Sequence, residues 1–461
     1  MQRSPSRSLT WLAVPVVFVV GIYVVWIFAT ERQRSAKLAQ VKKPATIEAY
    51  EELVDELYGT GSTVPILQPG TQADAGEFAG FPEDWEYILE GYRYLFGLLQ
   101  AREVAMDAET VDILRKEFHD RTDAEQSKVA DYLRANQDFV QEIRNMAERG
   151  GPVYPLDFSK GLEIELPHLA SLRQCARLLR EDAIAKAAAG NYTEAVEDVI
   201  AGMKLGDALA QESILLPQLV RIAIYWIMNA AVEDAFDEGK LSPELARAII
   251  ARVAEADNRQ AFAESMAGER HMGLMLFSEI RTGLSDSVSS FAGEMAFERF
   301  YGNPVARPIL NRDEAAYADI MNRTVVAALL TYHEAAPALE RIEVDIQNLA
   351  RTCVLSSMLL PALARACQAQ ARHEALLDLM QIGLLVEQYK ARKGSYPATL
   401  DAIAADLGGS LPVDPFTGEG YRYKLSGDSF LLYSVGQNCV DDGGAHDPMN
   451  GDIVWRGEQR P

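Results

Sequence analysis

Cysteine is scarce in this chain, which has only four in 461 residues. So few cysteines cannot build the disulfide framework that supports small secreted folds. Cys353 and Cys367 lie on one predicted helix, about 21 Å apart at 1.5 Å per residue, which is too far for a disulfide. Cys175 and Cys439 could pair only through the tertiary fold. The cysteine content therefore leaves the redox compartment open.

Positive charge is also in deficit. The chain has 44 Lys and Arg against 67 Asp and Glu, which gives a formal net charge of −23. A surface field of this sign repels phosphate backbones, so the composition predicts no nucleic-acid partner. Disorder is not expected either, because 48% of the residues are hydrophobic and the length allows a sizeable buried core.

Familiar catalytic signatures are missing. The sequence has no G-x-S-x-G elbow, no phosphate-binding loop and no Rossmann fingerprint. His333-Glu334 and His373-Glu374 begin like H-E-x-x-H, but the second histidine is absent from both. No two of the six histidines have metal-ligand spacing. The sequence therefore favours a protein that is not an enzyme.

The remaining ionisable residues receive structural interpretations. His168 follows a proline at a predicted helix start, so we expect it to cap or pack rather than to act as a base. Four acidic residues are expected on solvated faces: Glu163, Glu165, Asp182 and Glu194. Because catalytic sites can assemble from residues far apart in sequence, a hydrolase with its active site in the helical region is the alternative function.

The N-terminus contains an uncharged apolar run, LTWLAVPVVFVVGIYVVWIFA, from Leu9 to Ala29. Its length matches the roughly 20 residues that cross a hydrocarbon core. Trp11, Tyr23 and Trp26 lie near its ends, where aromatic rings settle at lipid headgroups. A cleaved signal peptide would have an apolar region of only about 7–15 residues. Residues 1–30 are therefore predicted to be an uncleaved, single-pass membrane anchor.

A second apolar stretch, ILLPQLVRIAIYWIMNAAV, runs from Ile214 to Val232 but contains Arg221 and Asn229. A charged residue near the middle of a membrane costs about 2.5–3.5 kcal/mol. This segment is therefore predicted to be a buried core helix.

Between the anchor and residue 350 the pattern is helical. Residues 31–81 are predicted to be a linker, because Gly59 to Gly80 is rich in Gly, Thr and Pro. Residues 82–350 are predicted to be an α-helical domain. Within it, residues 184–210 resemble a tetratricopeptide repeat, with Gly190, Tyr192 and Ala195 at its small, aromatic and small positions. One match and a looser echo at 237–250 predict an array of helical hairpins, short of a solenoid.

The last hundred residues carry an ordered set of motifs. A leucine-proline-alanine stretch leads into a long helix that ends in Y-K-x-x-x-G-x-Y-P, from Ser356 to Pro397. LPVDPF (411–416), GYRY (420–423), FLLYSVG (430–436) and GDIVW (451–455) follow. In this order the motifs resemble the major pseudopilin of type II secretion systems, a type IV pilin-like protein. Residues 351–461 are therefore expected to form an α+β unit, with the long helix packed on a small antiparallel sheet.

The resemblance also implies a metal. In the pseudopilin family the loop before the last strand binds calcium, which takes six to eight oxygen ligands. By motif position, Asp452 is the best match, and Asn438 stands where the family usually has Asp. Asp441 and Asp442 could supply further oxygens. Cys439 replaces a common glycine of the loop. Calcium is thus the expected cofactor, with Asn438, Asp441, Asp442 and Asp452 as its predicted ligands. The alternative is an acidic surface turn that binds no metal.

The departures from the family shape the predicted function. The N-terminus lacks the G-F-x-L-x-E cleavage motif of pseudopilins, and a chain anchored at residue 9 could not polymerise through an internal helix. The predicted fold is mainly α, with an N-terminal transmembrane helix, a hairpin array and the C-terminal α+β unit. We expect an accessory protein of secretion or pilus-like assembly that binds a protein partner.

Orientation is a conflict within the sequence. The cations after the anchor (Arg32, Arg34, Lys37, Lys42 and Lys43) outnumber Arg3 and Arg7 before it, and a positive-inside count would leave the body in the cytoplasm. The family setting favours export. Because long domains translocate largely regardless of flanking charge, the body is expected on the periplasmic side of the inner membrane.

Overall fold

The computed structural model describes residues 26–41, 108–116, 118–150, 156, 160–161, 164–236, 241–256, 258–282, 303–349, 353–427, 429–447 and 450–455. The predicted membrane span therefore lies outside the described residues up to position 25. Most of the predicted linker, and the predicted helical region from 82 to 107, also lie outside them.

The described chain is mainly helical, with one small antiparallel sheet, as the sequence predicts. After a first helix at residues 26–38, the longer elements are α4 (Ala108–Arg115), α5 (Asp123–Ala135), α6 (Gln137–Glu148), α7 (His168–Ala188), α8 (Tyr192–Ala208), α9 (Leu215–Ala235), α10 (Pro243–Ala254), α11 (Asn258–Thr282), α14 (Arg307–Ala328), α15 (Tyr332–Leu349), α16 (Val354–Leu359), α17 (Ala362–Lys393), α18 (Leu400–Leu407), β1 (Arg422–Ser426), β2 (Ser429–Ser434) and β3 (Ile453–Trp455).

Local sequence explains where several helices begin and end. Thr122 and Glu125 form a reciprocal capping box at the start of α5. Ser242 caps α10, with Pro243 at the first helical position. Gly190 follows α7 with φ +84°, a backbone conformation that glycine adopts without steric penalty.

The helix α9 is the one helix among the described residues that is long and apolar enough to cross a membrane. It is mostly buried within the helical body, where α7 and α8 pack against it. Its Arg221 donates to Asp207 at 2.8 Å, and its Asn229 donates to Glu233 at 2.9 Å. The polar residues of α9 thus have protein partners, which is the arrangement of a core helix.

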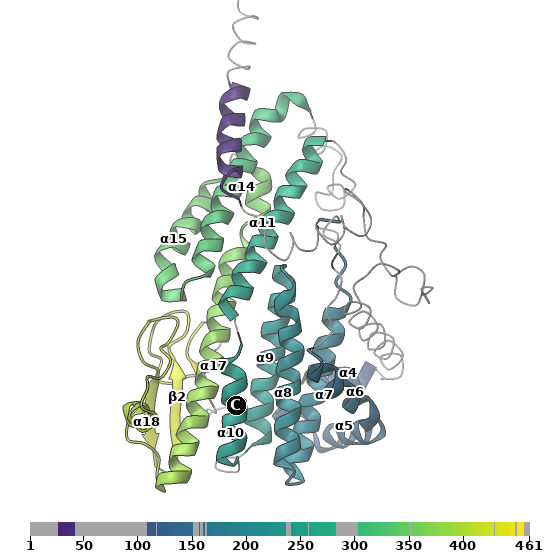
Figure 1. The fold of residues 1–461 in the computed structure, drawn as a ribbon, viewed down its shortest axis with the longest axis vertical. Helices are drawn as coiled ribbons and strands as arrows, with labels where there is room; N and C mark the ends of the chain where they lie inside the picture. Colours follow the sequence, from purple (N-terminus) through teal and green to yellow (C-terminus); the bar gives the residue numbers. More distant parts are fainter. Residues whose placement is uncertain are drawn as a thin grey trace, which may run out of the picture.

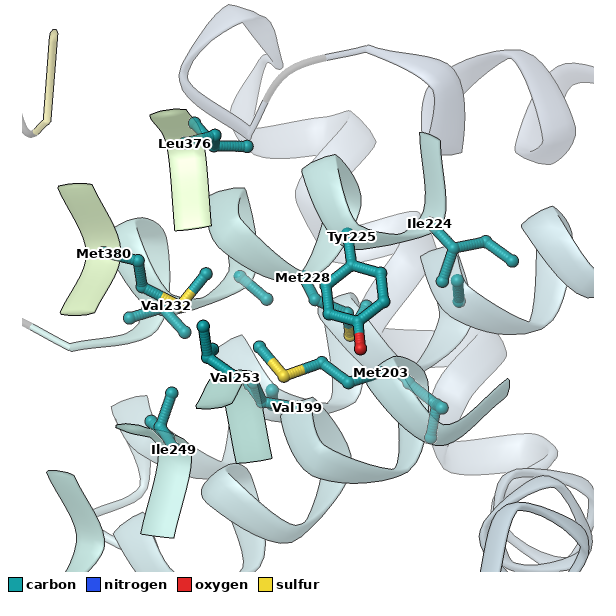
Figure 2. Close-up of a cluster of buried hydrophobic side chains, with 14 of the residues drawn as sticks. Val199, Met203, Ile224, Tyr225, Met228, Val232, Ile249, Val253, Leu376 and Met380 are labelled. Carbon is teal, nitrogen blue, oxygen red and sulfur yellow. The ribbon is translucent and has the colours of Figure 1, made fainter. Parts of the chain in front are cut away.

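The long helix α17 runs through the middle of the molecule (Figure 1). One side packs against α9 and α10, where Leu376 and Met380 join a cluster of buried side chains from α8, α9 and α10 (Figure 2). The other side packs against β2 and β3. Buried residues of α4 to α10, α17, α18 and the sheet therefore share one apolar core, which extends across the predicted boundary at 350/351.

A second apolar cluster lies where α11, α14, α15 and α16 meet the first turns of α17. Asp313 of α14 is buried and accepts N–H groups of Leu355 and Ser356, each at 3.0 Å. The carboxylate thereby satisfies the first turn of α16, which has no side-chain cap of its own. This cap joins the predicted helical domain to the start of the predicted C-terminal unit.

The sheet has the order β1-β2-β3, and both pairs are antiparallel. Gly427, with φ +60°, lies in the short turn between β1 and β2, where glycine adopts this backbone without steric penalty. Glycine also allows α17 to approach the sheet, because a Cβ on Gly383 would lie 2.1 Å from Nε1 of the buried Trp455. The predicted helix-on-sheet packing is present.

Several predicted boundaries are wrong. The long helix ends at Lys393, before Tyr396-Pro397, because Gly394 adopts φ +79° and closes it. It also begins later than predicted, because Pro361 separates α16 from α17. The helical pattern from Asp313 to Arg351 predicts one helix, but the structure has a break between α14 and α15, where Thr331 and Glu334 form the hydrogen bonds at the start of α15. Residues 31–38, at the start of the predicted linker, continue the first helix.

Candidate functional site

The C-terminal unit is built around the turn at Asp414-Pro415. The buried Asp414 side chain accepts N–H groups of Phe416 at 2.9 Å and Val435 at 3.2 Å. Its backbone carbonyl accepts the N–H of Gly418 at 2.7 Å. One aspartate thus fixes the turn to the end of β2, and burial raises the pKa of its carboxyl. The sequence indicates the turn but not this second attachment.

The acidic loop begins directly after β2, and Asp452 lies at its far end. The Asp452 side chain is fully buried and accepts N–H groups of Gly444 at 2.7 Å and Asp442 at 3.4 Å. Burial raises the pKa of this carboxyl, and the charges of Asp442 and Asp441 raise it further. The buried Asp452 carboxylate therefore holds the loop backbone in place, close to the negative charges of Asp441 and Asp442.

Asn438 and Asp442 lie together at the mouth of the loop. The Asn438 amide Nδ2 donates to Asp442 Oδ2 at 3.2 Å, while its Oδ1 accepts the N–H of Val440 at 2.9 Å. Asp442 Oδ2 also lies close to the backbone at Gly451, the residue that precedes Asp452. Three of the four predicted ligands, Asn438, Asp442 and Asp452, are thus brought to one turn.

The fourth predicted ligand, Asp441, faces the sheet. Its Oδ1 accepts the Tyr433 hydroxyl at 2.7 Å and the N–H of Gly443 at 2.9 Å. The Tyr433 bond and the Gly443 bond hold the pKa of this carboxyl below its usual range. Its other oxygen lies 3.9 Å from the Arg422 guanidinium. Asp441 is therefore already satisfied by protein donors.

These donors suit calcium in kind, because carboxylate, amide and backbone carbonyl oxygens are the ligands that this ion takes. Within the described residues, which omit 448 and 449 of this loop, no three His, Cys, Asp or Glu side chains form a metal-binding group. A calcium ion here would therefore have to draw on Asn438 and backbone carbonyls as well as on the carboxylates of Asp442 and Asp452.

Cys439 has the loop's unusual backbone. Its φ is +54°, and it is the one non-glycine residue with positive φ among those described. Left-handed backbone is strained for a residue with a Cβ and relaxed for glycine. The loop thus keeps glycine-like geometry at the position where the family resemblance expects glycine.

Ionisable residues singled out by the sequence also lie inside the helical body. His168 is buried, and its Nε2 lies 2.8 Å from Glu212 Oε1, which agrees with the packing role predicted for it. Asp182, predicted on a solvated face, is buried instead, with Lys186 at 2.8 Å and Arg144 at 3.3 Å. The prediction for Asp182 is wrong because its partners come from α6 and from the next turn of α7.

Asp198 of α8 shares these cationic partners, with Lys186 at 2.7 Å and Arg144 at 3.1 Å. Burial, together with the charge of Asp182, raises the pKa of Asp198 to about 7. Of the other acidic residues expected in solvent, Glu165 and Glu194 are exposed and Glu163 lies outside the described residues.

His333 and His373, the two histidines that precede glutamates, also contact other parts of the protein. His373 packs edge-on against Tyr225, and burial lowers its pKa to about 3. The backbone N–H of His333 donates to the carbonyl of Pro415 at 2.8 Å, which attaches α15 to the Asp414-Pro415 turn. Neither histidine therefore belongs to a metal site formed by described residues.

One pocket of the described body is lined by Phe262, Leu330, Leu339, Cys367 and Glu374 among others. Burial raises the pKa of the Cys367 thiol to about 12, so it is a poor nucleophile at neutral pH. Arg259 pairs with Glu374 at 3.1 Å.

A wider hollow lies between the turn before α8 and the start of α10, and Tyr192, Glu194 and Glu244 contribute to it. Neither of these two pockets contains a paired acid and base.

Comparison with known proteins adds no relative. No protein-family model, curated protein or solved structure matches the chain.

Proposed function

We propose that this chain is a membrane-anchored envelope protein without enzymatic activity, in which a helical body binds a protein partner and carries a calcium-stabilised, pseudopilin-like unit. Its role would be accessory to type II secretion or pilus-like assembly. The support is the motif order of the last hundred residues, together with their folding as a long helix on a three-stranded antiparallel sheet.

The observation that carries the accessory role is the burial of α17 on two sides. A filament subunit packs its long helix against other subunits. In this chain Leu376 and Met380 of that helix are covered by α9 and α10, and Gly383 is covered by Trp455 of β3. An α17 covered in this way has no long apolar face to offer to a filament. The unit would act as a fixed part of the helical body.

The partner-binding surface that we favour is the hollow between the two hairpin turns. Tyr192 and Leu245 give it apolar area, and Glu194 and Glu244 give it negative charge. With a net charge of −23 on the chain, a basic segment of a partner protein is the complementary ligand.

We propose that the helical body lies on the periplasmic side of the inner membrane. The excess of cations after the anchor favours the opposite orientation. Two of those cations, Arg34 and Lys37, pair with Glu314 and Asp319 of α14. Their presence therefore has a structural reason independent of membrane orientation.

Thermal unfolding of the full chain, with calcium, with magnesium and with a chelator, tests the metal. Calcium at 100 times its dissociation constant would stabilise the folded state by about 2.7 kcal/mol, a rise of several degrees in Tm. We expect no comparable rise with magnesium, which prefers tighter octahedral sites and keeps several of its waters.

Neighbouring aspartates provide the matched variants for this experiment. Asp442→Asn should abolish most of the calcium-dependent rise, whereas Asp441→Asn should retain it, because the Asp441 carboxylate is directed to Tyr433 and Gly443. Asp401→Asn, exposed on α18, controls for the loss of one charge. A Tm that is the same with calcium and chelator would remove the metal from the proposal. Equal loss in both loop variants would contradict the ligand assignment.

A further inference from the structure

The helix at residues 26–38 lies directly after the predicted membrane span and packs along α14 (Figure 1). Its Arg34 donates to Glu314 at 2.6 Å, and Lys37 forms an ion pair with Asp319. Near its start, Thr30 is buried and its Oγ1 lies 3.5 Å from the Asn311 amide. The helix thus makes polar contacts with the body at three successive levels.

The Glu314 contact is the strongest of the three. The Glu314 side chain is 3% exposed and also pairs with Arg281 of α11. Removal of either guanidinium group from a buried carboxylate is unfavourable, because it leaves charge uncompensated. The N-terminal helix is therefore part of the folded body.

The contacts also fix the register of the N-terminal helix along α14. Residues of the N-terminal helix contact α14 residues 280 to 282 positions later, in the same order along both helices. The helices are therefore parallel, and the same offset places Trp26 level with Arg307, the first residue of α14. Val305, in the short helix η4 (Pro304–Ala306), precedes it and lies toward the predicted span.

Exposed apolar side chains gather at this level. Val305 is 68% exposed, Phe28 71% and Trp26 43%. Trp26 and Phe28 belong to the last turn of the predicted span, where aromatic rings mark the lipid–water interface. A body that is fixed to this turn must hold Val305 at the same interface, because residues 26–38 contact α14 directly.

We propose that the N-terminal helix is a rigid strut and that the Val305 end of the body rests in the headgroup layer of the bilayer. This proposal rests on the membrane anchoring in the proposed function. The ligand is a lipid surface, contacted by Val305, Trp26 and Phe28. The C-terminal sheet and α18 would then point away from the membrane, because Figure 1 places them far from the N-terminal helix along the long axis.

Nitroxide labels on the full chain, reconstituted in phosphatidylcholine vesicles, test the strut. Cys439→Ser removes the exposed cysteine, while Cys175, Cys353 and Cys367 are buried. A label is then placed at Val305→Cys or, as a control, at Leu407→Cys on α18. We expect the Val305 label to collide with a water-soluble nickel chelate at least about threefold less often than the Leu407 label, as for a side chain at the headgroup boundary.

A charge-matched pair of variants tests the role of the ion pair. Arg34→Glu places two carboxylates together and should raise the chelate accessibility of the Val305 label to that of the Leu407 label. Arg32→Glu changes the same charge at an exposed position of the same helix and should leave the label protected. Circular dichroism and Tm establish that both variants retain the folded body.

The outcomes separate this proposal from the one on which it rests. Failure of the chain to float with vesicles would overturn the membrane anchoring itself. Flotation with equal accessibility at Val305 and Leu407 would leave the anchor in place and overturn the strut. Protection of Val305 that survives Arg34→Glu would show that the ion pair does not hold the body in position.

Discussion

The packing of α17 on the C-terminal sheet can be tested through one partly buried carboxyl. Asp378 of α17 accepts the hydroxyl of the buried Tyr421 at 2.8 Å, just before β1. Burial raises the pKa of Asp378 from its ordinary 3.8 to about 7, while the bond from Tyr421 opposes this rise. The carboxyl is therefore largely protonated at pH 5 in the folded state and ionised in the unfolded state.

The sign of the stability change follows from proton binding. Between about pH 4 and pH 7 the folded state holds a proton that the unfolded state has lost, so stability falls as pH rises through this range. A pKa raised from 3.8 to about 7 corresponds to about 4 kcal/mol. Asp378→Asn retains an acceptor for Tyr421 and has no charge to bury. Relative to wild type, the variant should gain up to about 4 kcal/mol between pH 4 and pH 8.

Urea unfolding at pH 4, 5.5, 7 and 8, followed by tryptophan fluorescence, measures this difference. Trp455 is buried beside α17, so it reports on the same interface. Tyr421→Phe should raise the pKa of Asp378 further and extend the decline in stability above pH 7, because the bond from Tyr421 favours the ionised form. Asp401→Asn, on exposed α18, controls for net charge. A pH-independent difference between Asp378→Asn and wild type would refute the burial of this carboxyl between α17 and the sheet.

Two further substitutions test the close contacts of the C-terminal unit. Gly383→Ala should destabilise the fold by about 2–3 kcal/mol, because its Cβ would overlap the Trp455 ring, whereas Gly409→Ala, with no atom near its Cβ position, should change little; equal unfolding midpoints would contradict the packing. Cys439→Gly should stabilise by about 0.5–1 kcal/mol by relieving left-handed backbone strain, and Cys439→Val should destabilise by about 1–2 kcal/mol; urea midpoints measure both, and the reverse order would show that the loop is not left-handed there.

Local patterns predicted the elements whose signals lie within a few residues. The β1–β2 hairpin follows from two runs of aromatic and leucine residues on either side of Gly427, because a short turn pairs the segments that flank it. The break before α15 was missed, since Leu329 and Leu330 continue the apolar pattern and only Thr331 with Glu334 indicates a new start. The capping signal was present in the sequence but was weaker than the periodicity around it.

Contacts between distant segments could not be predicted in the same way. Asp182 has the sequence context of an exposed helix residue, but Arg144 approaches it from α6. In the acidic loop, the residue types do not distinguish Asp441 from Asp442. The difference arises from Tyr433 on β2, whose hydroxyl takes up the Asp441 carboxylate once the sheet has formed. Tertiary neighbours therefore decide which predicted ligand stays available to a cation.

The position of α17 has a consequence for how the chain folds. Its residues Leu376 and Met380 complete the apolar cluster of α8, α9 and α10. On its other side, Gly383 contacts Trp455 of β3, and Asp378 accepts the Tyr421 hydroxyl just before β1. Removal of the last hundred residues would expose the α9–α10 face of that cluster, and removal of the helical body would expose the matching face of α17. Neither half can bury its apolar surface alone, so unfolding of the two halves should be coupled. The same dependence separates this chain from a free pilin-like subunit, because its long helix already has an intramolecular partner.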